Sequence, residues 1–375
     1  MLINNWYVAC ASSDIATDKP TRVQMLGCHF VLFRDAAGAV SCLADTCVHR
    51  GAALGDGELV EHTVACPYHG WRFGADGRCT LIPALGPGVV PPKRARVDRY
   101  PTQEKYGWVW TFLGDLPESQ RPAIPDLFPE FDDTVHWRRM PYQFEANANW
   151  MRFEENSLDT AHTNFVHRQF GAKRTPKLEP YPIELTEWGA RVAREKPAPQ
   201  QDQKSGEMAR LLAESGPRRS TQVSLEFSLV GLCHRIQPTF REGMSQISFT
   251  ARTPIDPWRS RAIGWQARNY LLEPEHDAER MAAIQLAVEE DLRVLEKVEP
   301  KLTPRSPTQE FLTETDGMEV AFRKVVARSA AAGNEIDIDR FEQLRRRQVL
   351  VIPSPGRREE PGNWVHDTVP LCGKA

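Results

Sequence analysis

The sequence lacks the features that direct a protein to a membrane or to nucleic acid. No stretch approaches the roughly 18 consecutive apolar residues that a membrane-spanning helix needs. The first residues, MLINNWYVACASSD, have neither a basic start nor a long apolar core, so no secretory signal is expected. The formal net charge of −3 offers no basic excess for a polyanion. We therefore expect a cytoplasmic protein without a nucleic-acid or membrane partner.

The sequence also lacks internal repeats, low-complexity tracts, a Gly-rich dinucleotide fingerprint and a flavin signature. The chain has 375 residues, of which 41 % are hydrophobic and 26 % are charged. This is the composition of a soluble globular protein that is long enough for two domains. Any electrons that the chain uses must come from a separate protein.

Two regions of different pattern predict two domains. Residues 1–115 contain short alternating segments separated by Gly-rich or Asp-rich turns, which is typical of small antiparallel sheets. Residues 116–130 contain four prolines and predict a linker, because proline removes a backbone donor and stops helices. Residues 131–375 form the second predicted domain.

The second region has longer strands and a long helix. Four predicted strands of one larger sheet lie at 182–195, 220–232, 245–253 and 261–272. The segment 148–167 is helical at its start, and a long helix is expected over 275–299, with Pro274 at its first turn. The polar segment 197–220 is rich in Gly and Pro at its ends, and we interpret it as a lid.

Two loops each offer one cysteine and one histidine. CVHRG begins at Cys47 and CPYHGW begins at Cys66, so Cys47, His49, Cys66 and His69 form a C-x-H and C-x-x-H pair. Zinc fingers usually group two cysteines in one turn and two histidines in another. A [2Fe–2S] cluster with two thiolates on one iron and two imidazoles on the other needs one of each per loop. The spacing favours this cluster over structural zinc.

The remaining cysteines have no such spacing. We expect them to be small buried apolar residues: Cys10, Cys28, Cys42, Cys79, Cys233 and Cys372.

A second group of candidate metal ligands lies at 155–167. Glu155, Asp159 and His162 are spaced i, i+4 and i+7, which would place them on one face of a helix. His167 would lie about 140° further round an ideal helix. The helix must therefore end or bulge between the two histidines if both are to bind one ion. Otherwise they are ordinary histidines, one on the helix and one exposed beyond its end.

Two imidazoles leave a ferrous ion short of a carboxylate ligand. In the predicted helix at 275–299, Asp291 falls where the apolar stripe should continue, whereas Glu289 and Glu290 fall on outer faces. The stripe consists of Met281, Ile284, Val288, Leu295 and Val298. An acid on a buried face is costly unless it is paired or binds a metal, so Asp291 is the candidate third ligand. Alternatively, Leu292 continues the stripe and Asp291 is solvated.

With both motifs in place, the chain resembles the catalytic component of Rieske non-haem iron aromatic-ring oxygenases. It is most similar to the phthalate dioxygenase and vanillate demethylase branch. CVHRG and CPYHGW look like the Rieske motif, and Cys47, His49, Cys66 and His69 match its four cluster ligands. The pattern E-x3-D-x2-H-x4-H at 155–167 matches the family's iron motif, which makes His162, His167 and Asp291 the mononuclear iron ligands by resemblance.

The resemblance implies an α+β fold. An N-terminal Rieske antiparallel β domain would be followed by a helix-grip (START-like) antiparallel-sheet domain. It implies a [2Fe–2S] cluster, a mononuclear Fe(II) and a head-to-tail homotrimer. Asp159 would be the electron-transfer bridge between His162 and His69 of a neighbouring subunit, with weaker support from Glu155 and Asn156.

The implied activity is hydroxylation of an aromatic, acidic substrate with O2. Electrons would come from an NAD(P)H-dependent reductase, either directly or through a ferredoxin. An arginine would suit the carboxylate of such a substrate. Oxidative O- or N-demethylation on the same scaffold stays open, as do a Rieske electron-transfer protein and a zinc-stabilised binding protein.

Overall fold

The structure is a computed structural model that describes residues 1–167, 176–179, 181–197 and 220–373. The predicted lid at 197–220 lies outside the described residues except for its two end positions. The chain forms two compact units. Unit 1 contains Met1–Ile124, Thr253–Pro257 and Ala327–Ala375, and unit 2 contains Pro125–Arg252 and Trp258–Val326. The change between units after Ile124 falls inside the Pro-rich segment.

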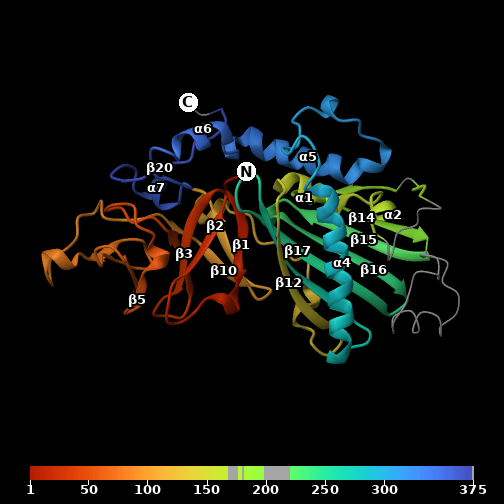
Figure 1. Cartoon of the computed structure of the whole chain (residues 1–375), viewed down its shortest axis with the longest axis horizontal. Helices are drawn as coiled ribbons and strands as arrows, with labels where there is room; N and C mark the ends of the chain where they lie inside the picture. Colours follow the sequence, from red (N-terminus) through yellow and green to blue (C-terminus); the bar gives the residue numbers. More distant parts are fainter. Residues whose placement is uncertain (168–175, 180, 198–219, 374–375) are drawn as a thin grey trace. The chain divides into compact units, whose positions relative to one another are not determined.

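The N-terminal part of unit 1, Met1–Ile124, contains three small antiparallel sheets (Figure 1). One has the order β1-β11-β10, another β2-β3-β4-β9 and the third β5-β6-β7-β8. The strands are β1 (Asn5–Ala11), β2 (Thr21–Met25), β3 (Cys28–Arg34), β4 (Val40–Ala44), β5 (Glu58–Val60), β6 (Thr63–Ala65), β7 (Arg72–Phe73), β8 (Cys79–Leu81), β9 (Arg99–Tyr100), β10 (Thr102–Lys105) and β11 (Trp108–Leu113).

The strand pattern of unit 1 was predictable because its apolar residues alternate or cluster in short runs. The segments VQMLG, HFVLFR, VSCLAD and WVWTF correspond to β2, β3, β4 and β11. Every residue of β11 is buried, including Trp108, Trp110 and Phe112. Aromatic and branched side chains of this kind supply the core of a small sheet unit.

The C-terminal segment packs in unit 1, which differs from its predicted place in the 131–375 domain. It contains α6 (Ile338–Leu344), β19 (Leu350–Val351), α7 (Gly356–Glu359) and β20 (Asp367–Thr368). Asp98 accepts hydrogen bonds from Ser354 Oγ at 2.6 Å and Arg357 Nε at 2.7 Å. These elements are short, so no periodic pattern in the sequence indicates which core they join.

Unit 2 is built around a seven-stranded sheet with the order β12-β18-β17-β16-β15-β14-β13 (Figure 1). The strands are β12 (Arg138–Ala146), β13 (Glu184–Leu185), β14 (Gly189–Pro197), β15 (Ser220–Ser228), β16 (Cys233–Arg241), β17 (Met244–Pro254) and β18 (Ser260–Arg268). Together with unit 1, this large antiparallel sheet and its helices confirm the predicted α+β fold class, with antiparallel strands in both units.

Three strand predictions in unit 2 need correction. β12 and β16 were not predicted, and the segment 182–195 forms two strands instead of one. β16 contains Pro238 and two arginines, and β12 contains Pro141, so their sequences lack a continuous strand signal. β12 and β16 form nevertheless, because they pair with neighbouring strands of the sheet. Tertiary context commonly overrides local strand propensity in this way.

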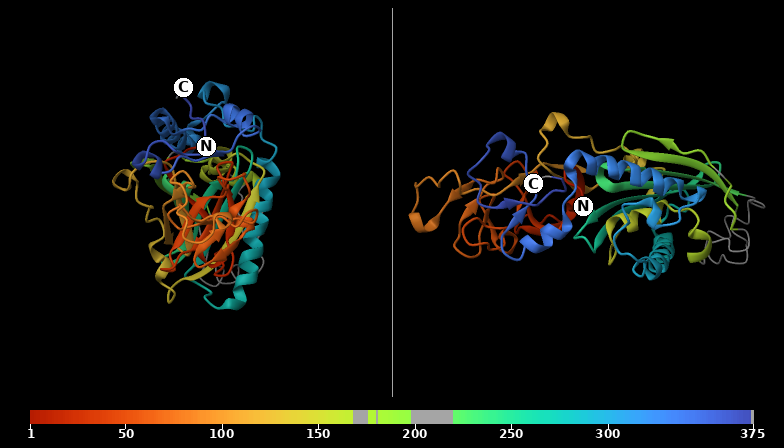
Figure 2. Two further views of the ribbon diagram at one scale, coloured as in Figure 1. Left: turned by 90° about the vertical axis from the view of Figure 1, so that its left-hand side faces the viewer. Right: turned by 90° about the horizontal axis from the view of Figure 1, so that it is seen from above.

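Among its described residues, unit 2 contains the helices α1 (Trp150–Leu158), α2 (Thr163–Val166), α4 (Asp277–Leu295) and most of α5 (Gly317–Ser329). α4 lies along the sheet, as Figures 1 and 2 show, and contacts α1, α2 and β12. A 3-10 turn at Pro274–His276 precedes it, so the predicted helix over 275–299 is present but shorter. Within the described part of the chain, no helix is long and apolar enough to span a bilayer.

Candidate metal centres

The two Cys/His loops have the same backbone hydrogen bonds. In each loop the cysteine N–H donates to the carbonyl five residues later, and the N–H of the glycine four residues later donates to the cysteine carbonyl. The residues are Cys47, Gly51 and Ala52 in the first loop, and Cys66, Gly70 and Trp71 in the second. Gly51 and Gly70 have φ of +75° and +69°, a conformation that favours glycine. Both loops therefore turn sharply at a glycine.

In both loops the cysteine side chain is buried and the histidine side chain is exposed. Cys47 and Cys66 are buried, at 1 % and 3 % exposed, whereas His49 and His69 are both exposed. The two imidazole rings lie 4.5 Å apart between centroids, and Trp71 stacks on His49 at 4.7 Å. Two inner sulfurs and two outer nitrogens are the donor set that a [2Fe–2S] cluster with chemically different irons requires.

The Cys47 thiol is costly to ionise without a metal. Burial raises the pKa of the Cys47 thiol to about 12, and the neighbouring Cys66 raises it as well. A bound cationic centre would stabilise both thiolates. The residues therefore fit the cluster. Of the other six cysteines, five are buried as expected, and Cys372 is partly exposed.

The second candidate centre begins where α1 ends. Glu155, Asp159 and His162 do not share one helix face as predicted, because α1 ends at Leu158. Asp159 Oδ1 accepts hydrogen bonds from the N–H groups of Ala161, at 2.6 Å, and His162, at 3.2 Å. A short carboxylate side chain that binds the next backbone donors competes with helix continuation. The turn that follows carries His162.

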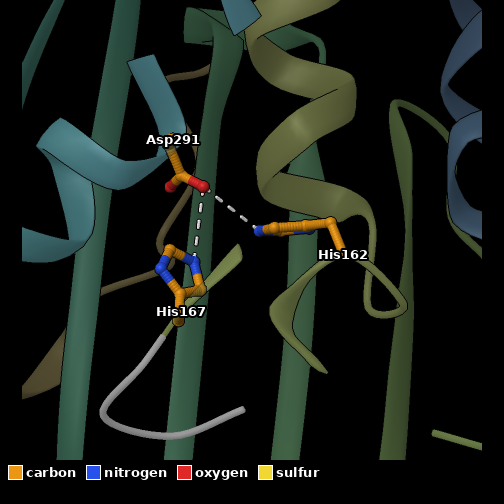
Figure 3. A group of neighbouring side chains, drawn as sticks. All are labelled: His162, His167 and Asp291. Carbon is orange, nitrogen blue, oxygen red and sulfur yellow. Dashed lines mark ion pairs between the residues drawn. The ribbon is translucent and has the colours of Figure 1, made fainter. Parts of the chain in front are cut away.

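The two histidines flank the four-residue helix α2 and face the same carboxylate (Figure 3). His162 Nε2 lies 3.4 Å and His167 Nε2 lies 3.3 Å from Asp291 Oδ1. One ligand atom from each of the three residues lies within 4.8 Å of the other two. The break that we predicted between the histidines is present, since α2 ends at Val166 and His167 is extended.

The three side chains fit a divalent metal ion. Asp291 Oδ1 is buried and makes no hydrogen bond to the described residues. Burial lowers the pKa of His162, but the Asp159 and Asp291 carboxylates outweigh that effect and raise it to about 9. A proton therefore occupies the imidazole in the metal-free protein, and a metal would replace it. Two imidazoles and one carboxylate form the facial set that suits non-haem Fe(II).

Glu290 is a neighbour of this centre that the sequence analysis placed wrongly. We expected it on an outer face of the helix, but it is only 5 % exposed. Its Oε2 lies 3.3 Å from Nδ1 of His167. Because α4 packs against both α1 and α2, it buries more than the single stripe that periodicity revealed. The sequence did offer a signal for Glu290, since it is an acid directly beside the candidate ligand Asp291.

Asp159 lies on the other side of His162. Its Oδ2 is 3.6 Å from His162 Nδ1, within ion-pair range, and its side chain is 29 % exposed. Glu155 does not support this contact, because its carboxylate accepts hydrogen bonds from Arg323 Nε, at 2.5 Å, and Arg323 Nη2, at 3.1 Å.

The candidate iron ligands open onto a cavity of about 760 Å³, which is within the range of small-molecule sites. Its walls come from one face of the seven-stranded sheet and from α4, and most of the lining is apolar. Apolar residues on the sheet side include Met140, Phe144, Val192, Val223, Leu225, Ile236 and Phe240; those on α4 include Ile284, Ala287 and Val288. This composition suits an aromatic ring.

A buried trio of hydrogen-bonded side chains lies beside the cavity and was missed by the sequence analysis; two of its members, His234 and Arg252, line the cavity. Glu154 accepts hydrogen bonds from His234, at 2.9 Å, and from Arg252, at 2.7 Å. All three side chains are at most 4 % exposed, and the Arg252 guanidinium lies 3.5 Å from the Phe153 ring centroid. The trio joins α1, β16 and β17, so its members are far apart in the sequence and give no local motif.

Two family models match the chain. Residues 5–101 match the Rieske [2Fe-2S] domain, and residues 146–332 match the vanillate O-demethylase oxygenase C-terminal domain. These segments contain all eight residues predicted for the two centres and the bridge.

Relatives and solved structures agree with these matches. The chain is 35 % identical over 166 residues to the 3-chlorobenzoate-3,4-dioxygenase oxygenase subunit of Comamonas testosteroni, covering 43 % of this chain and 37 % of that protein. It is 33 % identical over 183 residues to the phenoxybenzoate dioxygenase subunit alpha of Ectopseudomonas oleovorans, covering 44 % and 42 %. The matched segments thus span less than half the length of these relatives.

Dicamba monooxygenase bound to dicamba has the same fold. The TM-score is 0.71 at 24 % identity, over 92 % of this chain and 99 % of that one. The combination of a Rieske domain, an oxygenase C-terminal domain and this fold places the chain in the family of Rieske non-haem iron oxygenases.

Proposed function

We propose that this chain is the oxygenase component of a multicomponent system that hydroxylates an aromatic, acidic substrate with O2. The convergence of His162, His167 and Asp291 at the wall of a largely apolar cavity carries the proposal. Electrons would come from a separate NAD(P)H-dependent reductase, directly or through a ferredoxin. A homotrimer and a cytoplasmic location remain part of the proposal.

In this proposal His162, His167 and Asp291 hold Fe(II), which supplies the one-electron chemistry that dioxygen activation requires. Three protein ligands on one side leave the cavity side open for the substrate. Glu290 holds His167 through Nδ1, which fixes the ring so that Nε2 points at the metal position. The apolar walls orient the ring of the substrate and exclude water.

Cys47, His49, Cys66 and His69 would hold the [2Fe–2S] cluster and make the chain an electron store. Exposure of His49 and His69 supports electron exchange with another protein at that end of the loops. Asp159 is fixed by two backbone N–H groups and is partly exposed, which supports its proposed role as the bridge from His162 to His69 of a neighbouring subunit.

Oxidative O- or N-demethylation is the second candidate. The match of residues 146–332 to a vanillate O-demethylase oxygenase domain favours it. Hydroxylation and demethylation would use the same side chains and differ in which carbon the cavity presents to the metal position. A Rieske electron-transfer protein would need only the first centre and leaves the second unexplained.

Oxygen uptake with a panel of aromatic acids and aryl ethers, in the presence of a reductase and NAD(P)H, tests the proposal. Substrate-dependent uptake with an oxygenated product supports hydroxylation. Release of formaldehyde with loss of a methyl group supports demethylation instead. A protein that holds iron at both centres yet never couples oxygen uptake to any member of the panel would contradict both activities.

A further inference from the structure

Arg194 differs from the other arginines that line the cavity. Four arginines contribute to its walls: Arg194, Arg252, Arg268 and Arg280. Three of them are paired with a carboxylate, since Arg252 lies 2.7 Å from Glu154, Arg268 lies 2.8 Å from Asp277 and Arg280 lies 2.8 Å from Glu279. Across the parts of the chain that the structure describes, Arg194 has no ion-pair partner.

The strand β14 aims Arg194 at the cavity. Side chains alternate between the two faces of a strand, and Val192 and Arg194 both line the cavity. Arg194 pairs in register with Val223 of β15, which lines it too. Arg191 lies on the opposite face, is exposed, and donates hydrogen bonds to Glu184 at 2.8 and 2.6 Å. On its two faces the strand thus carries Arg191, which is paired with Glu184, and Arg194, which has no ion-pair partner among the described residues.

Among the described residues around Arg194, none places a carboxylate within ion-pair distance of the guanidinium. Its guanidinium lies 5.5 Å from the centroid of the Tyr181 ring, which offers a weak cation–π contact. Burial lowers the pKa of Arg194, while Tyr181 and Asp159 act in the opposite direction without forming an ion pair within 4 Å. A partly desolvated cation without a carboxylate is unfavourable unless a ligand supplies the anion.

We propose that Arg194 binds the carboxylate of the substrate and so selects aromatic acids over their neutral analogues. This inference rests on the proposed oxygenase function and assigns the arginine that such a substrate requires. The planar guanidinium can donate two parallel hydrogen bonds to a carboxylate. The apolar walls of the cavity then contact the aromatic ring of the substrate, and the substrate carboxylate forms the ion pair with Arg194.

Equilibrium binding of acid and amide pairs tests the proposal without turnover. The probes are benzoate, 3-chlorobenzoate, 4-methoxybenzoate and 3-phenoxybenzoate, each with its carboxamide, titrated by calorimetry into the iron-loaded protein under anaerobic conditions. We expect at least one acid to bind about 10- to 100-fold more tightly than its amide, the range of one charge-assisted hydrogen-bonded pair. Equal affinity for every acid and amide, or binding of neither, overturns the proposal.

Variants of β14 locate the effect. Arg194→Gln should weaken binding of the preferred acid about 10-fold or more and leave the amide unchanged, whereas Arg194→Lys should retain part of the preference. Arg191→Gln is the matched control and should bind both as the wild type does. The proposal is overturned if the Arg194→Gln protein still binds the acid more tightly than the amide, or if its affinities for the acid and the amide fall equally. Because binding needs no turnover, acid selectivity that depends on Arg194 without any oxygen uptake would contradict the proposed function alone.

Discussion

Asp291 Oδ1 lies 3.3 Å from Nε2 of His167, although one residue lies on the 19-residue helix α4 and the other follows the four-residue helix α2. Neither element determines this contact by itself. α4 must lie along the sheet, and the chain must break after α1, before the carboxylate and the imidazole meet.

Asp291→Ala should remove the mononuclear iron and abolish turnover. The side chain supplies the carboxylate that both imidazoles face, and two imidazoles alone leave the ion under-ligated. We expect a loss of about one iron equivalent per chain, while the visible spectrum of the cluster stays unchanged. Glu289→Gln, at an exposed position on the same helix, is the control. Full iron content in Asp291→Ala would contradict the ligand assignment.

Glu290→Gln should weaken the hold on the mononuclear iron without removing a ligand. The carboxylate lies 3.3 Å from His167 Nδ1 and orients that ring. Loss of such a partner typically costs about 10- to 100-fold in metal affinity. Competition with a chelator, followed by iron analysis, measures this change. If the variant and Glu289→Gln release iron equally, Glu290 has no positioning role.

Asp159→Asn should keep both metal centres but slow electron delivery. The amide oxygen can still accept the hydrogen bonds from the N–H groups of Ala161 and His162, so the turn is preserved. The negative charge beside His162 is lost. We expect oxidation of the reduced cluster, followed by stopped-flow absorbance with O2 and substrate, to slow by about 10- to 100-fold. Loss of the mononuclear iron would indicate a structural role instead.

Glu319 should make the stability of unit 2 depend on pH. Burial is the main cause that raises the pKa of this carboxyl from 4.5 to about 8, with further contributions from Asp159, Asp316 and Glu155. The native state therefore holds a proton that the unfolded chain releases above pH 4.5, so its stabilising effect is lost as pH rises toward and through 8.

The variant Glu319→Gln cannot lose that proton. Its apparent melting temperature should fall less than that of the wild type between pH 6 and pH 9, by an amount that corresponds to at most about 3 kcal/mol. Glu314→Gln, at an exposed position before α5, should behave as the wild type does. Parallel pH profiles for wild type and Glu319→Gln would show that the carboxyl is not protonated in the native state.

Asp98→Asn should destabilise unit 1 by loosening the C-terminal segment. Asp98 is 1 % exposed and accepts hydrogen bonds from Ser354 and from two nitrogens of Arg357. Removal of one partner of a buried ion pair costs about 3–5 kcal/mol. Limited proteolysis and thermal unfolding, with exposed Asp76→Asn as the control, measure the effect. Unchanged protease resistance after residue 327 would contradict the assigned contact.

The sequence predicted the two metal motifs because their residues are close together or fall at a helical period. Cys47 and His49, Cys66 and His69, and His162 and His167 are local pairs. Asp291 was found because an acid interrupted an apolar stripe. Glu290 was assigned to the wrong face, since the number of faces that a helix buries depends on how many elements pack against it.

Local sequence alone therefore predicted which side chains offer candidate metal ligands, several of the strands, and the Pro-rich segment in which the chain first passes from unit 1 to unit 2. These properties depend on residue type, spacing and turn chemistry over a few positions. The tertiary structure decided that α1 ends at Leu158, that residues 327–375 join unit 1, and that Arg194 faces the cavity without a carboxylate partner among the described residues. Each of these three outcomes depends on contacts between residues that are distant in the sequence. The free energies of such contacts cannot be read from a local sequence pattern.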